Sequence, residues 1–181
     1  MPFRGLSVVD DHVAWLSGSK GWVGLTIDGG NTWAFSQVKG FEASDFRSLY
    51  AFDARRAVIA NAGSPATILI TDDGGKIWKS VHTNVHKSAF IDGVDFWNEK
   101  DGMMYGDPID GKMLLLRSAD SGLTWVALSG APHLEKGEAS FAASGTGIRC
   151  TGKREVIIAT GGLVSRLWKS QAHNQSPHAF R

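Results

Sequence analysis

Residues 26–33 read TIDGGNTW, residues 71–78 read TDDGGKIW and residues 118–125 read SADSGLTW. The three stretches share the pattern Ser/Thr-x-Asp-x-Gly-x-x-Trp, and their aspartates are 45 and 47 residues apart. A period of this length is typical of a protein built from structural repeats. Asp-Gly and Gly-Gly between extended apolar runs also indicate hairpins, because glycine adopts positive φ at no steric cost. The stretches therefore predict β-hairpins at the same place in three successive repeats.

Each stretch is expected to be a structural staple. The aspartate accepts hydrogen bonds within its own turn, and the tryptophan anchors neighbouring sheets. The residues given these structural roles are Asp28, Gly30, Trp33, Asp73, Gly75, Trp78, Asp120, Gly122 and Trp125. Ile77 departs from the pattern, since the other two stretches have threonine there; it removes one hydroxyl and should leave the turn intact. One aspartate per turn is too few for calcium, and no metal is predicted.

The segments between the hairpins repeat as well. Residues 4–10, 47–53, 92–98 and 138–144 align, with starting points 43, 45 and 46 residues apart. Each is followed by a second β-rich run bounded by Gly, Asp or Asn, which is typical of four-stranded propeller blades. We predict repeats at about 1–40, 41–85, 86–130 and 131–170, followed by a polar, disordered tail at 171–181. No stretch has a long helical period, so helix is expected to be almost absent.

The hairpin pattern resembles the Asp-box (BNR) repeat of sialidases, xyloglucanases, sortilin-type receptors and photosystem II assembly-factor propellers. In those families the box joins the third and fourth strands of a blade and lies away from the active site. The resemblance implies an all-β fold: a partial β-propeller of about four blades with an incomplete fourth blade. Because Asp-box propellers usually have six or seven blades, the chain is expected to be a fragment of a larger propeller. A closed ring of four blades is the alternative.

Composition narrows the classes of partner. The chain has 181 residues with 19 basic and 18 acidic side chains, so no electrostatic footprint for nucleic acid is expected. No apolar run reaches the length of a membrane span, and no signal peptide precedes the first predicted strand. The single cysteine, Cys150, cannot form an internal disulfide. No cofactor is predicted, because the glycine-rich turns lack the βαβ surroundings of a nucleotide-binding loop.

The candidate site lies where the first strands of the blades line a central channel. The aligned residues at their starts are Arg4, Arg47, Asp92 and Glu138, which predict a ligand-binding channel mouth. Asp92 and Glu138 are also the candidate catalytic residues, since paired carboxyl groups cleave glycosides. Arginine suits the recognition of carboxylates. The alternative is that these four charges simply pair with one another across the channel.

Further segments, including residues 3–9, 106–111 and 137–145, resemble a bacterial group of photosystem II assembly factor-like proteins, often loosely named oxidoreductase or glycosyl hydrolase. This resemblance implies an exported, extracytoplasmic propeller. We therefore predict a non-catalytic scaffold that binds a protein or a glycan at the channel mouth and self-associates through its cut blade edge. The alternative is a sialidase-superfamily glycoside hydrolase lacking its remaining blades. A hydrolase requires an unpaired carboxyl group in an open pocket, whereas a scaffold predicts Arg4 and Arg47 paired with Asp92 and Glu138.

Overall fold

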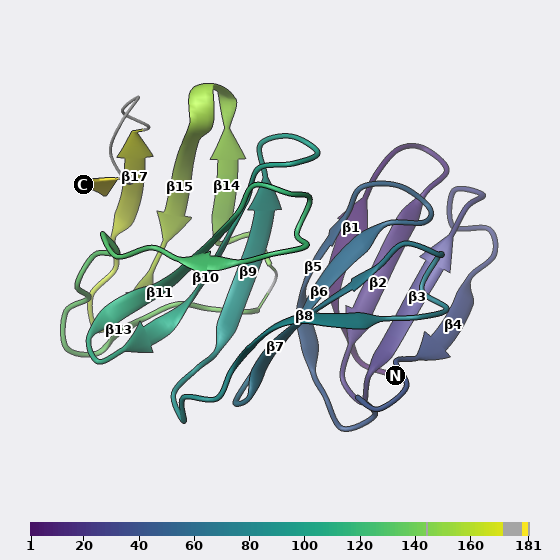
Figure 1. Ribbon diagram of the computed structural model, residues 1–181, viewed down its shortest axis with the longest axis horizontal. Coiled ribbons are helices and arrows are strands. Elements are labelled where there is room, and N and C mark those ends of the chain that lie inside the picture. The colour runs from purple at the N-terminus through teal and green to yellow at the C-terminus, as the bar shows by residue number, and fades with distance from the viewer. Residues whose placement is uncertain (144, 172–178, 181) are drawn as a thin grey trace.

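The computed structural model describes residues 1–143, 145–171 and 179–180. Apart from a single 3₁₀ turn, Gly152–Arg154, its regular elements are β-strands. The strands form four antiparallel sheets of four strands each, and the order of strands within every sheet follows the chain. Figure 1 shows the sheets arranged side by side as the blades of a partial propeller. The predicted all-β fold is confirmed.

Blade 1 consists of β1 (Phe3–Val8), β2 (Ala14–Gly18), β3 (Trp22–Thr26) and β4 (Ala34–Gln37). Blade 2 consists of β5 (Phe46–Ala51), β6 (Ala57–Asn61), β7 (Ala66–Thr71) and β8 (Lys79–Asn84). Blade 3 consists of β9 (Ile91–Phe96), β10 (Gly102–Ile109), β11 (Lys112–Ser118) and β12 (Val126–Ala127). Blade 4 consists of β14 (Ile148–Thr151), β15 (Glu155–Ala159), β17 (Leu167–Gln171) and β18 (Ala179–Phe180). A separate pair joins β13 (Glu138–Ala139) to β16 (Gly161–Gly162).

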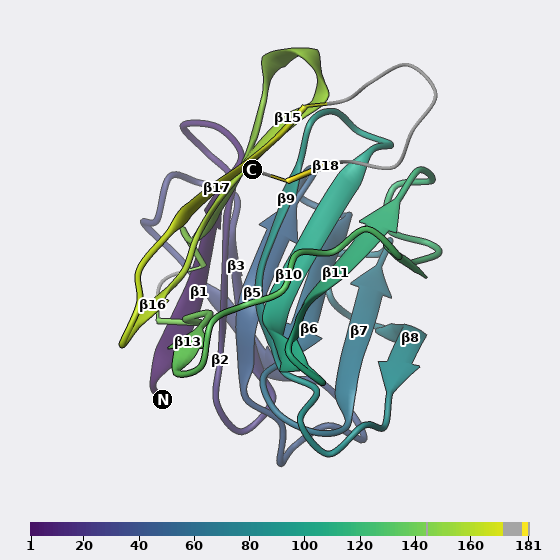
Figure 2. The ribbon, with the colours of Figure 1, turned by 90° about the vertical axis from the view of Figure 1, so that its left-hand side faces the viewer.

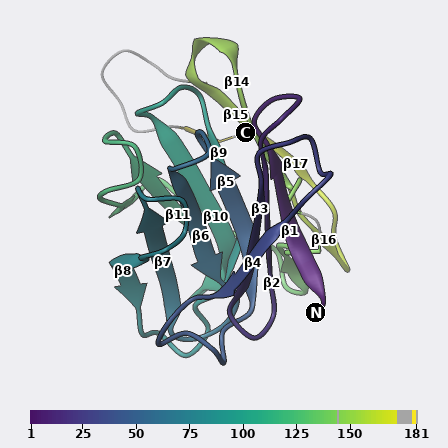
Figure 3. The ribbon, with the colours of Figure 1, turned by 90° about the vertical axis from the view of Figure 1, so that its right-hand side faces the viewer.

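The inner strands of successive blades contact one another: β1 with β5, β5 with β9, and β9 with β14. Blades 1 and 4 lie at opposite ends of the molecule, and Figures 2 and 3 view it from the side of blade 4 and of blade 1. Among the described residues, no helix is long and apolar enough to cross a membrane.

Three apolar clusters fill the spaces between the blades. One joins blades 1 and 2 around Trp15 and Phe46, and a second joins blades 2 and 3 around Ile68 and Met104. A third cluster, around Ile158, joins blades 3 and 4. Each blade therefore buries its apolar residues against its neighbours, as expected of a repeat protein in which one sheet cannot form a core alone.

The first hairpins of the four blades are equivalent. The pairs Val8–Ala14, Ala51–Ala57, Phe96–Gly102 and Cys150–Val156 each enclose five residues, which in blade 4 include the further pair Thr151–Glu155 around the 3₁₀ turn. Two hydrogen bonds between neighbouring inner strands join residues that are equivalent in the same way. Ser7 Oγ accepts from the N–H of Ala51 at 2.9 Å, and Asp95 Oδ2 accepts from the N–H of Cys150 at 2.8 Å. These equivalences match Thr146, two residues before β14, with Arg4, Arg47 and Asp92.

Blade 4 differs from the sequence alignment in its inner strand. The alignment equates residues 138–144 with the other first strands, but the described part of that segment, 138–143, contributes only β13, and the inner strand is β14. The outermost strand is β18, which pairs with β17. The prediction of a disordered tail at 171–181 falls largely outside the described residues, of which Gln171, Ala179 and Phe180 lie in strands.

Candidate functional site

The Asp boxes close their own hairpins. Asp28 Oδ1 accepts from the N–H of Thr32 at 2.9 Å, and its Oδ2 accepts from the Thr32 hydroxyl at 2.6 Å. Asp120 makes the same two bonds with Thr124. In the second box Asp73 keeps the backbone bond to Ile77, but the hydroxyl bond is missing, as Ile77 predicts. The Thr32 bonds lower the pKa of Asp28 to about 2, so the carboxylate is committed to its turn.

The boxes also fasten one blade to the previous one. A Cβ on Gly75 would approach the Trp15 ring of blade 1 to 3.0 Å, and one on Gly122 would approach Val58 of blade 2 to 2.9 Å. Both glycines have positive φ, +81° and +84°. Glycine is thus required here for conformation and for close contact.

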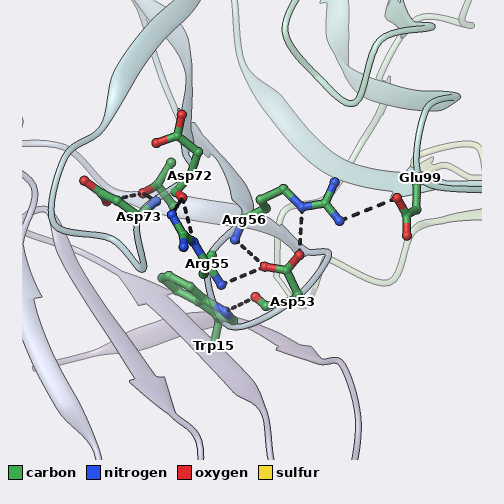
Figure 4. A network of polar contacts seen from close by, with 8 residues as sticks. Trp15, Asp53, Arg55, Arg56, Asp72, Asp73 and Glu99 are labelled. Carbon is green, nitrogen blue, oxygen red and sulfur yellow. Dashed lines mark hydrogen bonds and ion pairs between the residues drawn. The ribbon is translucent and has the colours of Figure 1, made fainter.

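A polar network extends this fastening at the same end of the blades (Figure 4). The Trp15 indole N–H donates to the carbonyl of Asp53 at 3.0 Å, and the Asp53 carboxylate accepts from the Nε of Arg56 at 2.7 Å. Arg56 also reaches Glu99 of blade 3 at 3.5 Å. The network links three blades through mutually neutralised groups, so we assign it a structural role.

The candidate channel mouth lies at the opposite ends of the inner strands. Pairing with the second strand is interrupted at Arg4, at Arg47 and at Asp92, so each is the extra residue of a β-bulge. A bulge changes the direction of a side chain and is common next to binding sites. Equivalent positions on three blades therefore present two cations and one carboxyl group at one end of the channel.

The two arginines have different surroundings. Arg4 is exposed and forms no ion pair with any residue that the structure describes. The Nε of Arg47 pairs with Asp45 at 2.8 Å, and its guanidinium lies 5.8 Å from the centre of the Phe90 ring. Phe90 also lines a pocket of about 420 Å³, together with Lys87 and Asp107. This end of the channel thus combines cationic groups with an apolar surface.

Asp92 is buried without a cation bound to it. Its side chain is only 1% exposed, and no hydrogen bond reaches its Oδ2 among the described residues. Burial and, as a smaller cause, the nearby Asp107 carboxylate together raise the pKa of Asp92 to about 8, while the Asp107 backbone N–H and Arg47 oppose the shift. The carboxyl group is therefore largely protonated at neutral pH.

Glu138 lies in a different environment, in β13. Arg166 Nε donates to both of its carboxylate oxygens at 3.1 Å, and the Thr160 hydroxyl donates to Oε1. The Arg166 bonds lower the pKa of Glu138 to about 2. The Arg166 guanidinium stacks on Trp168 at 4.2 Å. Glu138 therefore ties its segment to β17, and its charge is neutralised by an arginine that the sequence analysis did not consider.

The structure aligns Arg4, Arg47 and Asp92 at equivalent positions and puts Thr146 in the fourth. The pairing of the two arginines with Asp92 and Glu138 that was expected of a scaffold is wrong: in the described chain Arg4 has no ion pair, Arg47 pairs with Asp45, and Glu138 pairs with Arg166. A smaller pocket of about 220 Å³ in the channel is lined by Arg47, Tyr50, Asp95 and Arg149, among others. The sequence did not predict Arg149 as a residue of the site. A signal for the correct alignment existed, because Gly147 follows Thr146 as glycine follows Arg4 and Asp92. In the described part of the chain, no three metal-ligating side chains cluster.

Known proteins show where this architecture occurs. Residues 3–88 match the family model described as photosynthesis system II assembly factor YCF48. The solved structure of YCF48 bound to D1 peptide is 20% identical, with a TM-score of 0.63 over 98% of this chain and 53% of that one. No curated protein sequence is significantly similar to the chain.

Two solved enzymes are also similar. The GH74 enzyme of Niastella koreensis is 18% identical, with a TM-score of 0.65 over 96% of this chain and 23% of that one. A NanB sialidase from Streptococcus pneumoniae is 18% identical, with a TM-score of 0.61 over 91% and 27%. The chain thus spans about half the length of YCF48 and about a quarter of these enzymes. The chain therefore has the Asp-box (BNR) β-propeller fold, and its residues 3–88 match the model of the photosystem II assembly factor YCF48 family.

Proposed function

We propose that the chain is a non-catalytic scaffold that binds a segment of another protein at the end of the channel where the inner strands begin. The observation that carries the proposal is the set of bulges that present Arg4, Arg47 and Asp92 from three successive blades. Arg4 lacks an ion pair with any described residue and Arg47 lies over Phe90, so this end offers cationic and apolar contacts together. The YCF48 match, and the structure of YCF48 with a bound peptide, support the same class of function.

The chemistry favours an extended segment with a carboxylate. Arginine forms bidentate, charge-assisted hydrogen bonds with carboxylates, and a protonated Asp92 donates a hydrogen bond if the segment reaches it. The pocket beside Phe90 accepts an apolar side chain. Glycan binding at this mouth, association between copies and an extracytoplasmic location also stay predictions for this chain.

The test is binding of the full chain to an array of immobilised peptides with free carboxyl termini. Hits are then measured in solution by fluorescence anisotropy. We expect the Arg4→Gln/Arg47→Gln variant to lose at least about tenfold in affinity. The matched control is Arg55→Gln, the same substitution in an exposed arginine at the opposite end of the blades. Equal losses in both variants, or no hits with the native chain, would refute the proposal.

The hydrolase alternative rests on Asp92 and Glu138, and the structure gives it little support. Both carboxyl groups are buried, and Glu138 is held by Arg166. Of these two carboxyl groups, only that of Asp92 has a raised pKa, as a general acid requires. Hydrolysis of a panel of aryl glycosides that is lost in Asp92→Asn would restore this alternative.

A further inference from the structure

Two carboxyl groups of the described chain are almost fully buried, and only one of them has a cation. Glu138 is 3% exposed and pairs with Arg166. Asp92 is 1% exposed, and neither it nor the nearby Asp107 forms an ion pair with a described residue. Burying a carboxylate is unfavourable unless it is paired. The site of Asp92 therefore lacks the partner that Glu138 has.

Asp92 and Asp107 come from the neighbouring strands β9 and β10. The backbone N–H of Asp107 donates to the Asp92 carboxyl group and, at 3.1 Å, to the carbonyl of Phe90. Oδ1 of Asp107 accepts from the N–H of Ser140 at 3.1 Å. No hydrogen bond from a described residue reaches Oδ2 of Asp92. Since buried polar atoms are normally hydrogen-bonded, this oxygen is available to a ligand.

The pocket beside Phe90 gives access to the pair. Asp107 lines this pocket of about 420 Å³, and Ala89, Phe90, Pro108 and Ala139 supply apolar walls. Such walls suit the methylene stem of a long side chain that carries a charge at its end. Lys87 also lines the pocket, but it is exposed and pairs with no described carboxylate. The chain's own lysine thus leaves the two carboxyl groups free.

We propose that Asp92 and Asp107 together bind a basic side chain, lysine or arginine, of the protein segment that occupies the channel mouth. This inference rests on the proposed function and adds to it that the segment carries a basic residue as well as a carboxylate. The ammonium or guanidinium group brings several N–H donors, which match the two carboxyl groups. A metal ion fits less well, because no three metal-ligating side chains cluster among the described residues.

Binding of a cation should release protons from the pair. Burial raises the pKa of both carboxyl groups in the empty site, and a bound cation favours their ionised forms. Affinity for a segment with a basic residue should therefore increase as pH rises from about 6 to about 8.5. The other charged or titratable groups around the pair and its pocket are Asp45, Arg47, His86, Lys87, Tyr105 and Glu138.

The test uses the array peptides that bind the full chain, with each lysine replaced by norleucine or each arginine by citrulline. Fluorescence anisotropy should show a loss of at least about tenfold in affinity and a flat pH profile for the neutral peptide. Asp107→Asn should lose as much for the basic peptide, because asparagine keeps an oxygen for Ser140 but carries no charge. The control is Asp110→Asn, the same substitution at an exposed residue of the same hairpin, which should bind as the native chain does.

The outcomes separate this inference from the proposed function. Hits that need Arg4 and Arg47 but contain no basic residue, or bind equally well with norleucine, would overturn the inference and leave the proposed function standing. An equal loss for basic and neutral peptides in Asp107→Asn would show that the residue is only structural, which also overturns it.

A native chain that binds no peptide refutes the proposed function, and the carboxyl pair is then tested alone. The probe is n-butylammonium, with 1-butanol as its neutral counterpart, added to the isotopically labelled full chain. We expect the ammonium, but not the alcohol, to shift the backbone amide resonances of Ser88 and Ser140, and Asp107→Asn to abolish the shifts. Equal shifts with both probes, or none with either, would overturn the inference.

Discussion

The second Asp box contains a natural deletion of one hydrogen bond. Ile77 stands where Thr32 and Thr124 donate to the box aspartate at 2.6 Å in the other two boxes. We expect Ile77→Thr to restore that bond to Asp73 and to raise the melting temperature by about 1–2 °C. Ile27→Thr is the matched control, because Ile27 is 64% exposed and Ile77 is 61% exposed, while Ile27 does not occupy the bonding position. Equal melting shifts in both variants would show that the hydroxyl bond contributes nothing.

Asp92 makes stability depend on pH. Its pKa in the folded chain is raised to about 8 by burial, so the folded state holds a proton that an unfolded aspartate releases above about pH 4. The free energy of unfolding should therefore fall as pH rises from about 4 through about 8. Burial also raises the pKa of Asp107, which adds a dependence of the same sign.

Asp92→Asn keeps the shape of the side chain and removes this titration. We expect the variant to be more stable than the native chain at pH 9 and to show a flatter profile between pH 6 and 9. Urea unfolding at each pH gives the measurement. The exposed Asp11→Asn is the control and should run parallel to the native chain. An Asp92→Asn profile that also runs parallel to the native one would mean that Asp92 is already ionised when folded.

At the scale of elements, one ion pair holds the segment between β12 and β14 in its folded position. Glu138 is buried in β13, and Arg166 supplies its cation from the turn before β17. Arg166→Met leaves this carboxylate buried and unpaired, so we expect a loss of about 3 kcal/mol in the free energy of unfolding. Limited proteolysis should then cut residues 129–147 first. The double variant Glu138→Leu/Arg166→Met should recover much of the loss; if it does not, stacking of Arg166 on Trp168 is the larger contribution.

Blade 4 also shows how much of the candidate site can be predicted from the sequence. The repeat period places Arg4, Arg47 and Asp92 at equivalent positions, because the first two intervals, of 43 and 45 residues, are nearly equal. It does not place Glu138, because the segment between the third box and blade 4 is longer: Asp28 to Arg47 and Asp73 to Asp92 are 19 residues each, whereas Asp120 to Thr146 is 26. The partner of Glu138 was also out of reach, because contact between residues 138 and 166 depends on how that segment folds back. Local turn chemistry is readable from one sequence, and long-range pairing of charges is not.

At the scale of the whole molecule, the three inter-blade clusters make stability a sum of neighbouring contacts. Trp15 is the largest fully buried side chain of the cluster between blades 1 and 2, where it meets Trp78 edge-on at 6.1 Å and bonds Asp53. Trp15→Ala should therefore cost about 3–5 kcal/mol. Hydrogen exchange should accelerate in β1 to β4 and leave β10 and β11 protected.

Trp125→Ala is the matched variant at the contact between blades 2 and 3, where Trp125 packs on Phe96 at 5.9 Å. It should release the amides of blade 3 while those of β2 and β3 stay protected. Exchange in blade 1 that rises equally in both variants would mean that the blades unfold as one cooperative unit. The two variants should instead show different exchange patterns if each blade is held only by its neighbours. A lost contact then weakens the two blades that share it and no others.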